Sequence, residues 1–428
     1  MAIHTTAEIN NETWQRIPRR YAWVVFALTF GLLLSDYMSR QVLNVVFPML
    51  KAEWGLSDTE LGSLSSVVNI AVGLLAFPLS LMADRWGRIR SLSIMAAIWS
   101  VATLVCGVAS GYHEMLVSRF FVGVGEAAYA SVGLAVVLSI FPPSQRSTVT
   151  GAFFAGSMIG SVLGIGLGGV LATQFGWRTS FVGMAIYGMV LTALYAIVVK
   201  PSRLDSPAVS QNAQLAKIRP PLRSLFSTPS VVSIYIGSGL QLFITGALIA
   251  WLPSYLNRFY DMDLPRAGGV AAIFVLSSAA GMPICGAIAD RFCHDLPTRR
   301  MALAVAFCML CASLLTIALS LPLGTAQLTV IGMAMFFGAG IMGPMGNMVA
   351  NLTPAPIHST AMATWALSNN LIGLAPGPFI TGLLADRMGL ASALQLLPLA
   401  GVAASLVLMV GVRNYHHDLE HVRQQQYA

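Results

Sequence analysis

Two acidic side chains interrupt the apolar segments of this chain, and each has an arginine on the same helical face. Asp36 and Arg40 are four residues apart, and Arg119 and Glu126 are seven apart, so both spacings are close to whole turns of a helix. The other 15 of the 17 Asp and Glu lie in predicted loops, tails or segment ends. A charge inside an apolar membrane segment costs between ~2.5 and ~17 kcal/mol, depending on the reference, so it is retained where it has a partner and usually a function. These four residues are therefore expected to carry the chemistry of the protein.

Carboxylates in this setting can carry protons. Burial disfavours the charged form of Glu126 while Arg119 favours it, and this competition can leave the carboxyl exchanging its proton near neutral pH. The alternative is a structural ion pair that holds two helices together, although a buried ion pair seldom adds net stability. Asp36 is either a second proton-carrying group or a counter-ion for Arg40.

The arginines can bind an anion. The guanidinium of Arg40 stays charged and has a planar fork that matches a carboxylate. Alternatively, Arg40 and Asp36 only neutralise each other. Arg119 either receives the anion or keeps Glu126 ionised until the anion displaces it. Further candidates for lining the same cavity are Tyr37 and Tyr129.

The composition places these residues in a membrane protein. Hydrophobic residues make up 56% of the 428 and charged residues 10%, with a mean hydropathy of +0.73, whereas a soluble domain carries roughly 25% charged residues. Because the apolar segments are too long for membrane strands and do not alternate, we expect twelve transmembrane helices of about 20 residues or more. They are predicted near 22–48, 61–83, 91–110, 114–140, 147–172, 179–199, 230–256, 267–290, 300–321, 327–351, 359–385 and 391–412.

The distribution of basic residues predicts the orientation. Of the 24 Lys and Arg, 17 lie in the tails and loops on the side of the N-terminus, and five lie on the opposite side. This bias predicts cytoplasmic termini, most simply in a bacterial inner membrane. The net charge of +7 does not indicate nucleic-acid binding, because the basic residues are scattered between apolar segments. The five cysteines are expected to be packing residues rather than disulfide or metal ligands.

The two halves of the chain repeat. Four glycines recur at a constant offset of 213 residues: Gly160, Gly164, Gly169 and Gly176 match Gly373, Gly377, Gly382 and Gly389. A segment rich in proline and basic residues separates the halves. We therefore predict a six-helix bundle at 1–199, a cytoplasmic linker at 200–229 and a second six-helix bundle at 230–428, with a cavity on the axis between the bundles.

Three motifs carry a family resemblance that covers nearly the whole chain. Asp84-Arg85-Trp86-Gly87-Arg88 resembles the loop motif of the major facilitator superfamily, with Ser80 in place of the usual leading glycine and Ile89 interrupting the basic run. The stretch Arg119-Phe-Phe-Val-Gly-Val-Gly-Glu126-Ala resembles the anion:cation symporter and Spinster-like branches of that superfamily. So does Ser35-Asp-Tyr-Met-Ser-Arg40-Gln, although those families place the acid directly before the arginine, where this chain has Ser39.

The resemblance implies a fold and roles for several residues. The fold is all-α, with two pseudo-symmetric six-helix bundles that transport by alternating access. In the resembled symporters the acid that matches Glu126 couples protons, and the arginine that matches Arg40 binds the substrate. The resemblance also implies that Asp84 contacts the N-terminus of the segment 359–385, near Ser359, and closes the cytoplasmic side. The remaining gating candidates are Arg85, Arg88, Asp290 and Arg291, of which Asp290 and Arg291 should mirror this contact at the segment 147–172. For all of these residues, Asp84 included, a solvated loop charge is the alternative.

The second half lacks charges at the positions that match this cluster. By the repeat, Asp36 corresponds to Gln241, Arg40 to Thr245 and Glu126 to Ile341. Neutral polar groups are therefore its substrate candidates, with interhelical hydrogen bonding as the alternative: Gln241, Trp251, Tyr255, Asn347, Asn369 and Asn370. The four-residue spacing of Gly156, Gly160, Gly164 and Gly168 predicts close helix packing rather than a phosphate loop.

We expect a proton-coupled symporter that imports a small organic anion, such as a carboxylate or a sugar acid. It is expected to work as a monomer and without a cofactor, a metal or a nucleic-acid partner. The first alternative is a Spinster-like transporter or exporter of a lysolipid or another amphiphile, with a substrate that does not depend on Arg40. The second is a non-transporting membrane sensor or scaffold, which would need a signalling domain. No nucleophile or metal partner accompanies the histidines at useful spacing, so an enzyme is not expected.

Overall fold

The computed structural model describes residues 17–200, 225–226, 228–293, 297–353 and 357–427, without the side chains of 84, 143, 147, 297, 359 and 421–427. The described part is helical and contains no strand. Eleven of its helices are long and apolar enough to cross a membrane. In the first half of the chain the helices are α2 (Arg19–Trp54), α3 (Asp58–Trp86), α4 (Arg88–Val108), α5 (Tyr112–Glu126), α6 (Tyr129–Ile140), the short η1 (Pro143–Gln145), α7 (Arg146–Phe175) and α8 (Trp177–Val198).

The second half repeats this order of helices. Its elements are α11 (Pro229–Tyr260), α12 (Leu264–Phe292), α13 (Pro297–Ser320), α14 (Thr325–Ala339), α15 (Met342–Asn351), α16 (His358–Ser368), the π-helix η4 (Asn369–Leu374), α17 (Pro376–Met388), α18 (Leu390–Gln395) and α19 (Leu397–Tyr427). The eleventh predicted span, 359–385, is present but divided among α16, η4 and α17. It is the one predicted span that is not among the eleven helices that are long and apolar enough to cross a membrane.

Two predicted spans are interrupted at matching places. The span 114–140 breaks between α5 and α6 at Ala127 and Ala128, and the span 327–351 breaks between α14 and α15 at Gly340 and Ile341. The first break directly follows Glu126, whose counterpart in the repeat is Ile341. Broken helices in transporters provide ion and substrate sites, because the interruption frees backbone groups inside the protein. These breaks were not predicted from the sequence.

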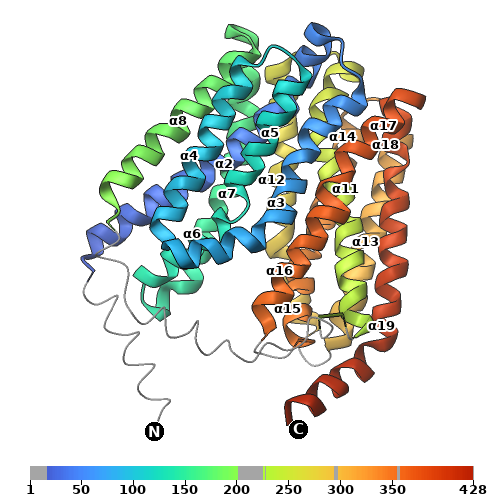
Figure 1. Cartoon of the computed structure of the whole chain (residues 1–428). Coiled ribbons are helices and arrows are strands. Elements are labelled where there is room, and N and C mark those ends of the chain that lie inside the picture. Colours follow the sequence, from blue (N-terminus) through green and yellow to red (C-terminus); the bar gives the residue numbers. More distant parts are fainter. Residues whose placement is uncertain (1–16, 201–224, 227, 294–296, 354–356, 428) are drawn as a thin grey trace. The chain divides into compact units, whose positions relative to one another are not determined.

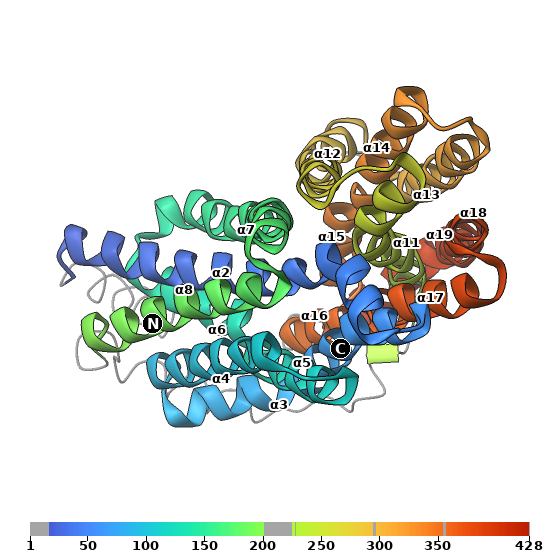
Figure 2. The same cartoon turned by 90° about the horizontal axis from the view of Figure 1, so that it is seen from above.

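The chain divides into two compact units. The first contains residues 1–42 and 74–218, and the second contains residues 43–73 and 219–428. The outer part of the α2–α3 hairpin, 43–73, therefore groups with the helices of the second half. In the first unit α4 packs against both α5 and α8 (Figure 1). In the second unit α14 packs against both α12 and α13 (Figure 2).

Glycines let α7 approach α2 within the first unit, as their spacing predicts. A Cβ atom at Gly164 would lie 2.7 Å from the carbonyl oxygen of Met38, and one at Gly168 would lie 2.8 Å from Cγ2 of Val42. The second unit contains the same contact, because Gly377, which matches Gly164 in the repeat, lies against the backbone of Phe243 in α11. Phe243 follows Met38 by 205 residues, which is the same offset by which Gln241 follows Asp36. The packing therefore follows the internal repeat.

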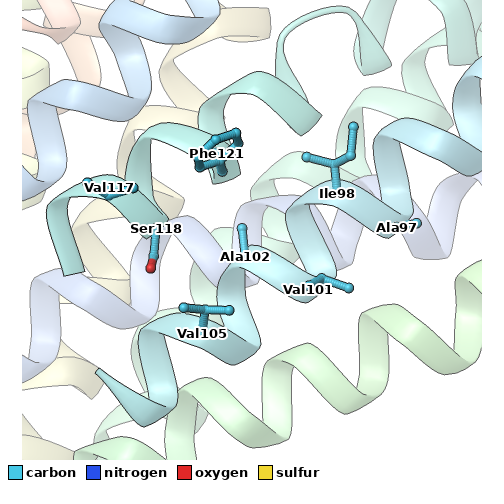
Figure 3. Close-up of a pocket in the computed structure, with 8 residues that line it drawn as sticks. All are labelled: Ala97, Ile98, Val101, Ala102, Val105, Val117, Ser118 and Phe121. Atoms are coloured by element: carbon cyan, nitrogen blue, oxygen red, sulfur yellow. The ribbon is translucent and has the colours of Figure 1, made fainter. Parts of the chain in front are cut away.

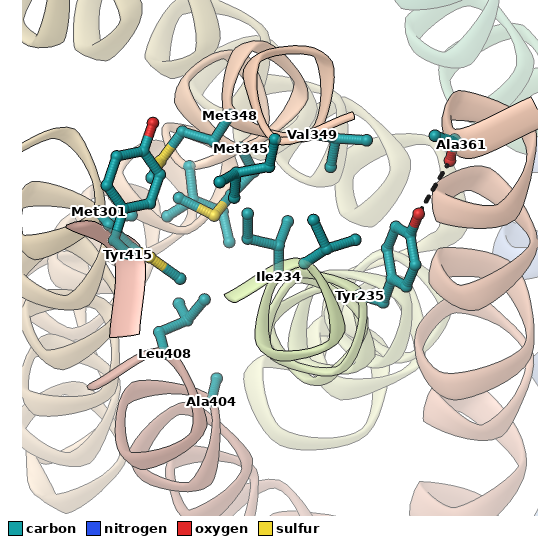
Figure 4. Packing of buried hydrophobic residues seen from close by; sticks show 14 of the residues in the cluster. Ile234, Tyr235, Met301, Met345, Met348, Val349, Ala361, Ala404, Leu408 and Tyr415 are labelled. Carbon is teal, nitrogen blue, oxygen red and sulfur yellow. Dashed lines mark hydrogen bonds between the residues drawn. The ribbon is translucent and has the colours of Figure 1, made fainter. Parts of the chain in front are cut away.

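An apolar core holds one end of the second unit together. Figure 4 shows Ile234 of α11 among Met345, Met348 and Val349 of α15, with Leu408 of α19 beside them. These five side chains are buried. The cluster contains no ionised group among its labelled members, which agrees with a structural role for this region.

Candidate functional site

The buried charges of the first unit meet at Arg40. Its Nε atom lies 2.6 Å from Oε2 of Glu126 and 3.4 Å from Oδ1 of Asp36. Asp36 precedes Arg40 by one turn of α2, while Glu126 comes from the C-terminal end of α5. The sequence predicted the Asp36–Arg40 neighbourhood from its spacing. The structure adds that Glu126 approaches the same nitrogen.

The members of this cluster differ in exposure. The side chain of Glu126 is 0% exposed and that of Asp36 3%, whereas that of Arg40 is 18% exposed. Arg40 is thus the member of this trio that is open to a ligand. A carboxylate that approached it would find the charge-assisted donors of a guanidinium in a poorly solvated site.

Arg119 reaches the cluster through the backbone of α2. It is buried, and its Nη1 donates a hydrogen bond of 3.0 Å to the carbonyl oxygen of Ser39, the residue before Arg40. The hydroxyl of Ser39 in turn donates to the carbonyl oxygens of Ser35 and Asp36. Arg119 therefore supports the turn of α2 that carries the charged pair. Because every residue has a backbone carbonyl, the sequence does not show which one an arginine binds, and this contact was not predicted.

The two tyrosine candidates have different surroundings. The guanidinium carbon of Arg40 lies 5.5 Å from the ring centre of Tyr37, a cation–π contact. Tyr129 is buried, donates a 2.9 Å hydrogen bond to the carbonyl oxygen of Thr29, and packs edge-on against Trp99. Tyr37 therefore belongs to the Arg40 cluster, while Tyr129 makes interhelical contacts in the core of the first unit.

Three candidates of the second unit have side chains that make hydrogen bonds to neighbouring helices. The amide nitrogen of Gln241 lies 3.3 Å from the sulfur of Cys311. The indole of Trp251 donates to the carbonyl oxygen of Pro378 at 2.9 Å, and the hydroxyl of Tyr255 donates to Gln327 at 3.1 Å. All three side chains are buried. These contacts match the interhelical hydrogen bonding that the sequence left as the alternative role.

The asparagine candidates lie on α15 and at the π-helix η4. Asn369 accepts a hydrogen bond from the hydroxyl of Ser238, which also receives the indole hydrogen of Trp365 at 2.8 Å. Asn370 donates to the carbonyl oxygen of Ala366 one turn earlier, and the exposed Asn347 accepts from Asn351. π-Helices occur frequently at functional sites. Ser238 and Trp365 are polar neighbours of η4 that were not among the candidates predicted from the sequence.

The gating candidates are described only in part. The side chain of Asp84 lies outside the described residues, so its contact near Ser359, whose side chain is also outside them, stays a prediction. Arg85 and Arg291 are exposed, and Arg88 is half-buried. Oδ1 of Asp290 lies 3.0 Å from Nη2 of Arg300, a partner on α13.

An apolar pocket of about 550 Å³ lies apart from these charges. It is formed by α4 and α5 and lined by Ala97, Ile98, Val101, Ala102, Val105, Val117, Ser118 and Phe121 (Figure 3). Val101, Val117 and Phe121 are exposed, so the pocket is a groove on an apolar face. None of the predicted site residues lines it. Among the described residues no three His, Cys, Asp or Glu could hold a metal ion, and the five cysteines form no disulfide.

Comparison with known proteins assigns the family. The model of the Major Facilitator Superfamily matches residues 29–353. The chain belongs to the major facilitator superfamily. As a member of this superfamily it is a multi-pass membrane protein and a transporter, not an enzyme, as the sequence predicted.

Two relatives in the superfamily and one solved structure are informative. The chain is 29% identical to a probable L-galactonate transporter of Escherichia coli, over 86% of this chain and 84% of that protein. It is 26% identical to a gallate transporter of Pseudomonas putida, over 91% of each. Its fold matches the crystal structure of a bacterial homologue of the human lysosomal transporter Spinster, with a TM-score of 0.82, 18% identity and coverage of 94% of this chain and 99% of that one.

Proposed function

We propose that this transporter is a symporter that moves a small organic anion together with protons by alternating access. Glu126 carries a coupling proton, Arg40 binds the anion, and Asp36 is a second proton-carrying group beside them. We place the protein in a bacterial inner membrane as a monomer with both termini in the cytoplasm. The imported substrate is a carboxylate or a sugar acid.

One observation carries this proposal: a single partly exposed guanidinium, that of Arg40, lies between two buried carboxylates. If all four charged residues are ionised, Asp36 and Glu126 balance Arg40 and Arg119. A carboxylate that binds Arg40 adds one negative charge to this poorly solvated cluster. Because an uncompensated charge there is costly, the anion binds most favourably when one of the acids takes up a proton. This charge balance couples the movement of the anion to the movement of protons.

The names of the relatives support the class of substrate. L-Galactonate is a sugar acid and gallate is an aromatic carboxylate, so both relatives are named for small anions that carry a carboxylate. Arg40 provides the kind of donor that such groups share. These two compounds are therefore the first probes to test.

The test is transport by purified protein in proteoliposomes, with L-galactonate and gallate as probes chosen by a thermal-shift screen that also contains a lysolipid. Glu126→Gln mimics the protonated acid, so it should exchange the substrate down its own gradient but fail to accumulate it under an imposed pH difference. Glu114→Gln is the matched control on α5, because Glu114 is exposed and binds Ser110 instead. Accumulation by Glu126→Gln at the wild-type level would exclude Glu126 as the coupling acid.

The screen also separates the alternative. A Spinster-like transporter of an amphiphile would be stabilised by the lysolipid and not by the carboxylates, since ligands stabilise the folded state that binds them. Its binding would also be insensitive to substitution of Arg40. Either result would replace the organic-anion proposal.

A further inference from the structure

Three helix ends meet at the buried carboxylate of Asp58 in the second unit. Oδ1 of Asp58 lies 2.7 Å from Nζ of Lys51, and the two oxygens of Asp58 accept hydrogen bonds of 2.6 and 2.8 Å from Nη2 and Nη1 of Arg258. Asp58 itself is 3% exposed. Lys51 lies in the last turn of α2, Asp58 begins α3 and Arg258 lies in the last turn of α11. Two-pronged pairing to a guanidinium is among the stronger polar contacts that proteins make.

Two carboxylates, those of Glu60 and Asp386, cap the backbone N–H groups at the start of α3. Ser57 and Glu60 form a capping box, in which the hydroxyl of Ser57 accepts from the backbone N–H of Glu60 and the carboxylate of Glu60 accepts from that of Ser57. The N–H groups of Asp58 and Thr59 are left over. Oδ1 and Oδ2 of Asp386 accept from them at 2.7 and 2.8 Å. Asp386 therefore completes the cap of a helix that is far away in the sequence.

Several forces favour an ionised Asp386. A carboxylate is stabilised at a helix N-terminus, where the backbone N–H groups carry partial positive charge. Burial raises the pKa of Asp386, but the hydrogen bonds from Thr59 and from the backbone of Asp58 outweigh burial and hold the pKa below its usual value. The carboxylate is thus the form that caps α3 at neutral pH.

Asp386 stands in a sequence that the chain uses elsewhere. Ala385-Asp386-Arg387-Met388-Gly389 shares four of five residues with Ala83-Asp84-Arg85-Trp86-Gly87. The helices that end in these sequences, α17 and α3, are each followed by a glycine with a positive φ angle, 84° at Gly389 and 91° at Gly87. Asp84, in the pentapeptide 83–87, is predicted to meet the N-terminus of the segment 359–385. The pentapeptide 385–389 stands at the C-terminal end of that same segment.

We propose that Lys51, Asp58, Thr59, Arg258 and Asp386 form a clasp that holds the α2–α3 hairpin to α11 and α17 and opens once in every transport cycle. The inference rests on alternating access as part of the proposed function. Residues 43–73 belong to the first six-helix half by sequence, whereas α11 and α17 belong to the second. A cycle in which the halves rock against each other must break contacts between such helices and form them again.

The contacts are suited to repeated opening. Asp386 is exposed and the side chain of Lys51 is 39% exposed, so water can reach both groups when the clasp opens. The capping box of Ser57 and Glu60 stays within the hairpin and preserves the start of α3 in either state. Close backbone contact is also present, because Gly62 lies against Pro378 and Gly382 lies against Asp58 without a side chain between them.

The chain contains a matched control for this cap. Asp418 of α19 is buried and accepts a 2.9 Å hydrogen bond from the backbone N–H of Ser230, at the start of α11. Both helices belong to the second half of the repeat, so this aspartate should stay in place throughout the cycle. Asp386→Asn and Asp418→Asn make the same chemical change at helix N-termini, but only the first should release the hairpin.

The experiment measures the distance between spin labels on a background without the native cysteines. Labels at Ala52, near the end of α2, and at Arg266, in the first turn of α12, are both exposed and lie in the second unit. Asp386→Asn should add a population at longer distance and raise the ratio of open to closed protein by about 2- to 30-fold, as expected for one charge at a helix terminus. Arg258→Gln removes the guanidinium that binds Asp58, so it should also raise the ratio of open to closed protein.

The outcomes are decisive and need no substrate. A distance distribution that both variants leave unchanged would overturn the clasp. An equal shift in Asp418→Asn would also overturn it, because it would show that any lost cap loosens the protein. Failure of the proton-coupling test with Glu126→Gln would leave these results untouched, so the clasp and the symport proposal can fail separately.

Discussion

At the scale of single residues, the geometry around Arg40 makes the shape of its side chain important. A lysine keeps the charge but replaces a planar fork by a compact ammonium, which cannot hold a carboxylate with two parallel hydrogen bonds. Arg40→Lys should lose about 1.5–3 kcal/mol of binding free energy, which corresponds to about 10- to 150-fold in affinity. Calorimetry with the stabilising carboxylate measures this directly.

A second arginine provides the control for this substitution. Arg178 stacks on Trp177 at 4.3 Å and donates to the carbonyl oxygen of Ala109, so it lies outside the charged cluster. Arg178→Lys should keep the wild-type dissociation constant. If Arg40→Lys keeps it too, Arg40 is a structural partner of Asp36 and Glu126 and the substrate is anchored elsewhere.

Individual charges were predictable from the sequence, but their partners were predictable only in part. Asp36 and Glu126 could be selected because a carboxylate inside an apolar segment is costly. The sequence could pair Asp36 with Arg40, which share a helix, but not Glu126 with Arg40, because that contact depends on how α2 packs against α5. The residues of the clasp were missed for the opposite reason. Asp58 and Asp386 lie at segment ends, where a charge is common and carries little information.

At the scale of helices, hydropathy predicted where the spans lie but not where they break. Ala127 and Ala128 are as apolar as their neighbours, so nothing in the composition marks the end of α5 directly after Glu126. The same is true of the π-helix at Asn369–Leu374, which depends on the packing of the helices around it. The glycine spacing was a better guide, since small residues four apart have few purposes other than close packing.

The glycine contact between α7 and α2 gives a prediction with an internal control. A Cβ at Gly164 would meet the backbone of Met38 at 2.7 to 2.8 Å, whereas one at Gly166 would meet nothing within 4 Å. Gly164→Ala should therefore force α7 away from α2 and destabilise the protein by about 1–3 kcal/mol, as overpacking does. Gly166→Ala on the same helix should be neutral or slightly stabilising.

Thermal unfolding in detergent compares the two variants under identical conditions. A lower midpoint for Gly164→Ala beside an unchanged one for Gly166→Ala would support the contact. Equal midpoints would mean that α7 can move away from α2 without cost. The position of Arg40 on α2 would then be set by α5 rather than by the glycine face of α7.

At the scale of the whole molecule, the internal repeat was visible in the sequence while the grouping of the hairpin 43–73 was not. The constant glycine offset predicted that the two halves repeat, and Gly164 of α7 and Gly377 of α17 make equivalent contacts. Hydropathy cannot show that the outer part of α2 and α3 groups with the helices of the second half. That grouping depends on the conformation that the chain adopts, and the conformations of the proposed transport cycle share one sequence.

At the same scale, the predicted cap by Asp84 and the proposed cap by Asp386 should have opposite effects on the transport cycle. If Asp84 stabilises the state closed on the cytoplasmic side and Asp386 stabilises the state closed on the opposite side, both act on one equilibrium. Both aspartates stand at the C-terminal ends of their membrane segments, which the predicted topology places on opposite sides of the membrane, so their free energies should add. On the Asp386→Asn background, Asp84→Asn should return the Ala52–Arg266 distance distribution toward that of the wild type. A double variant that keeps the full shift of Asp386→Asn would show that the two pentapeptides do not report on a shared two-state equilibrium.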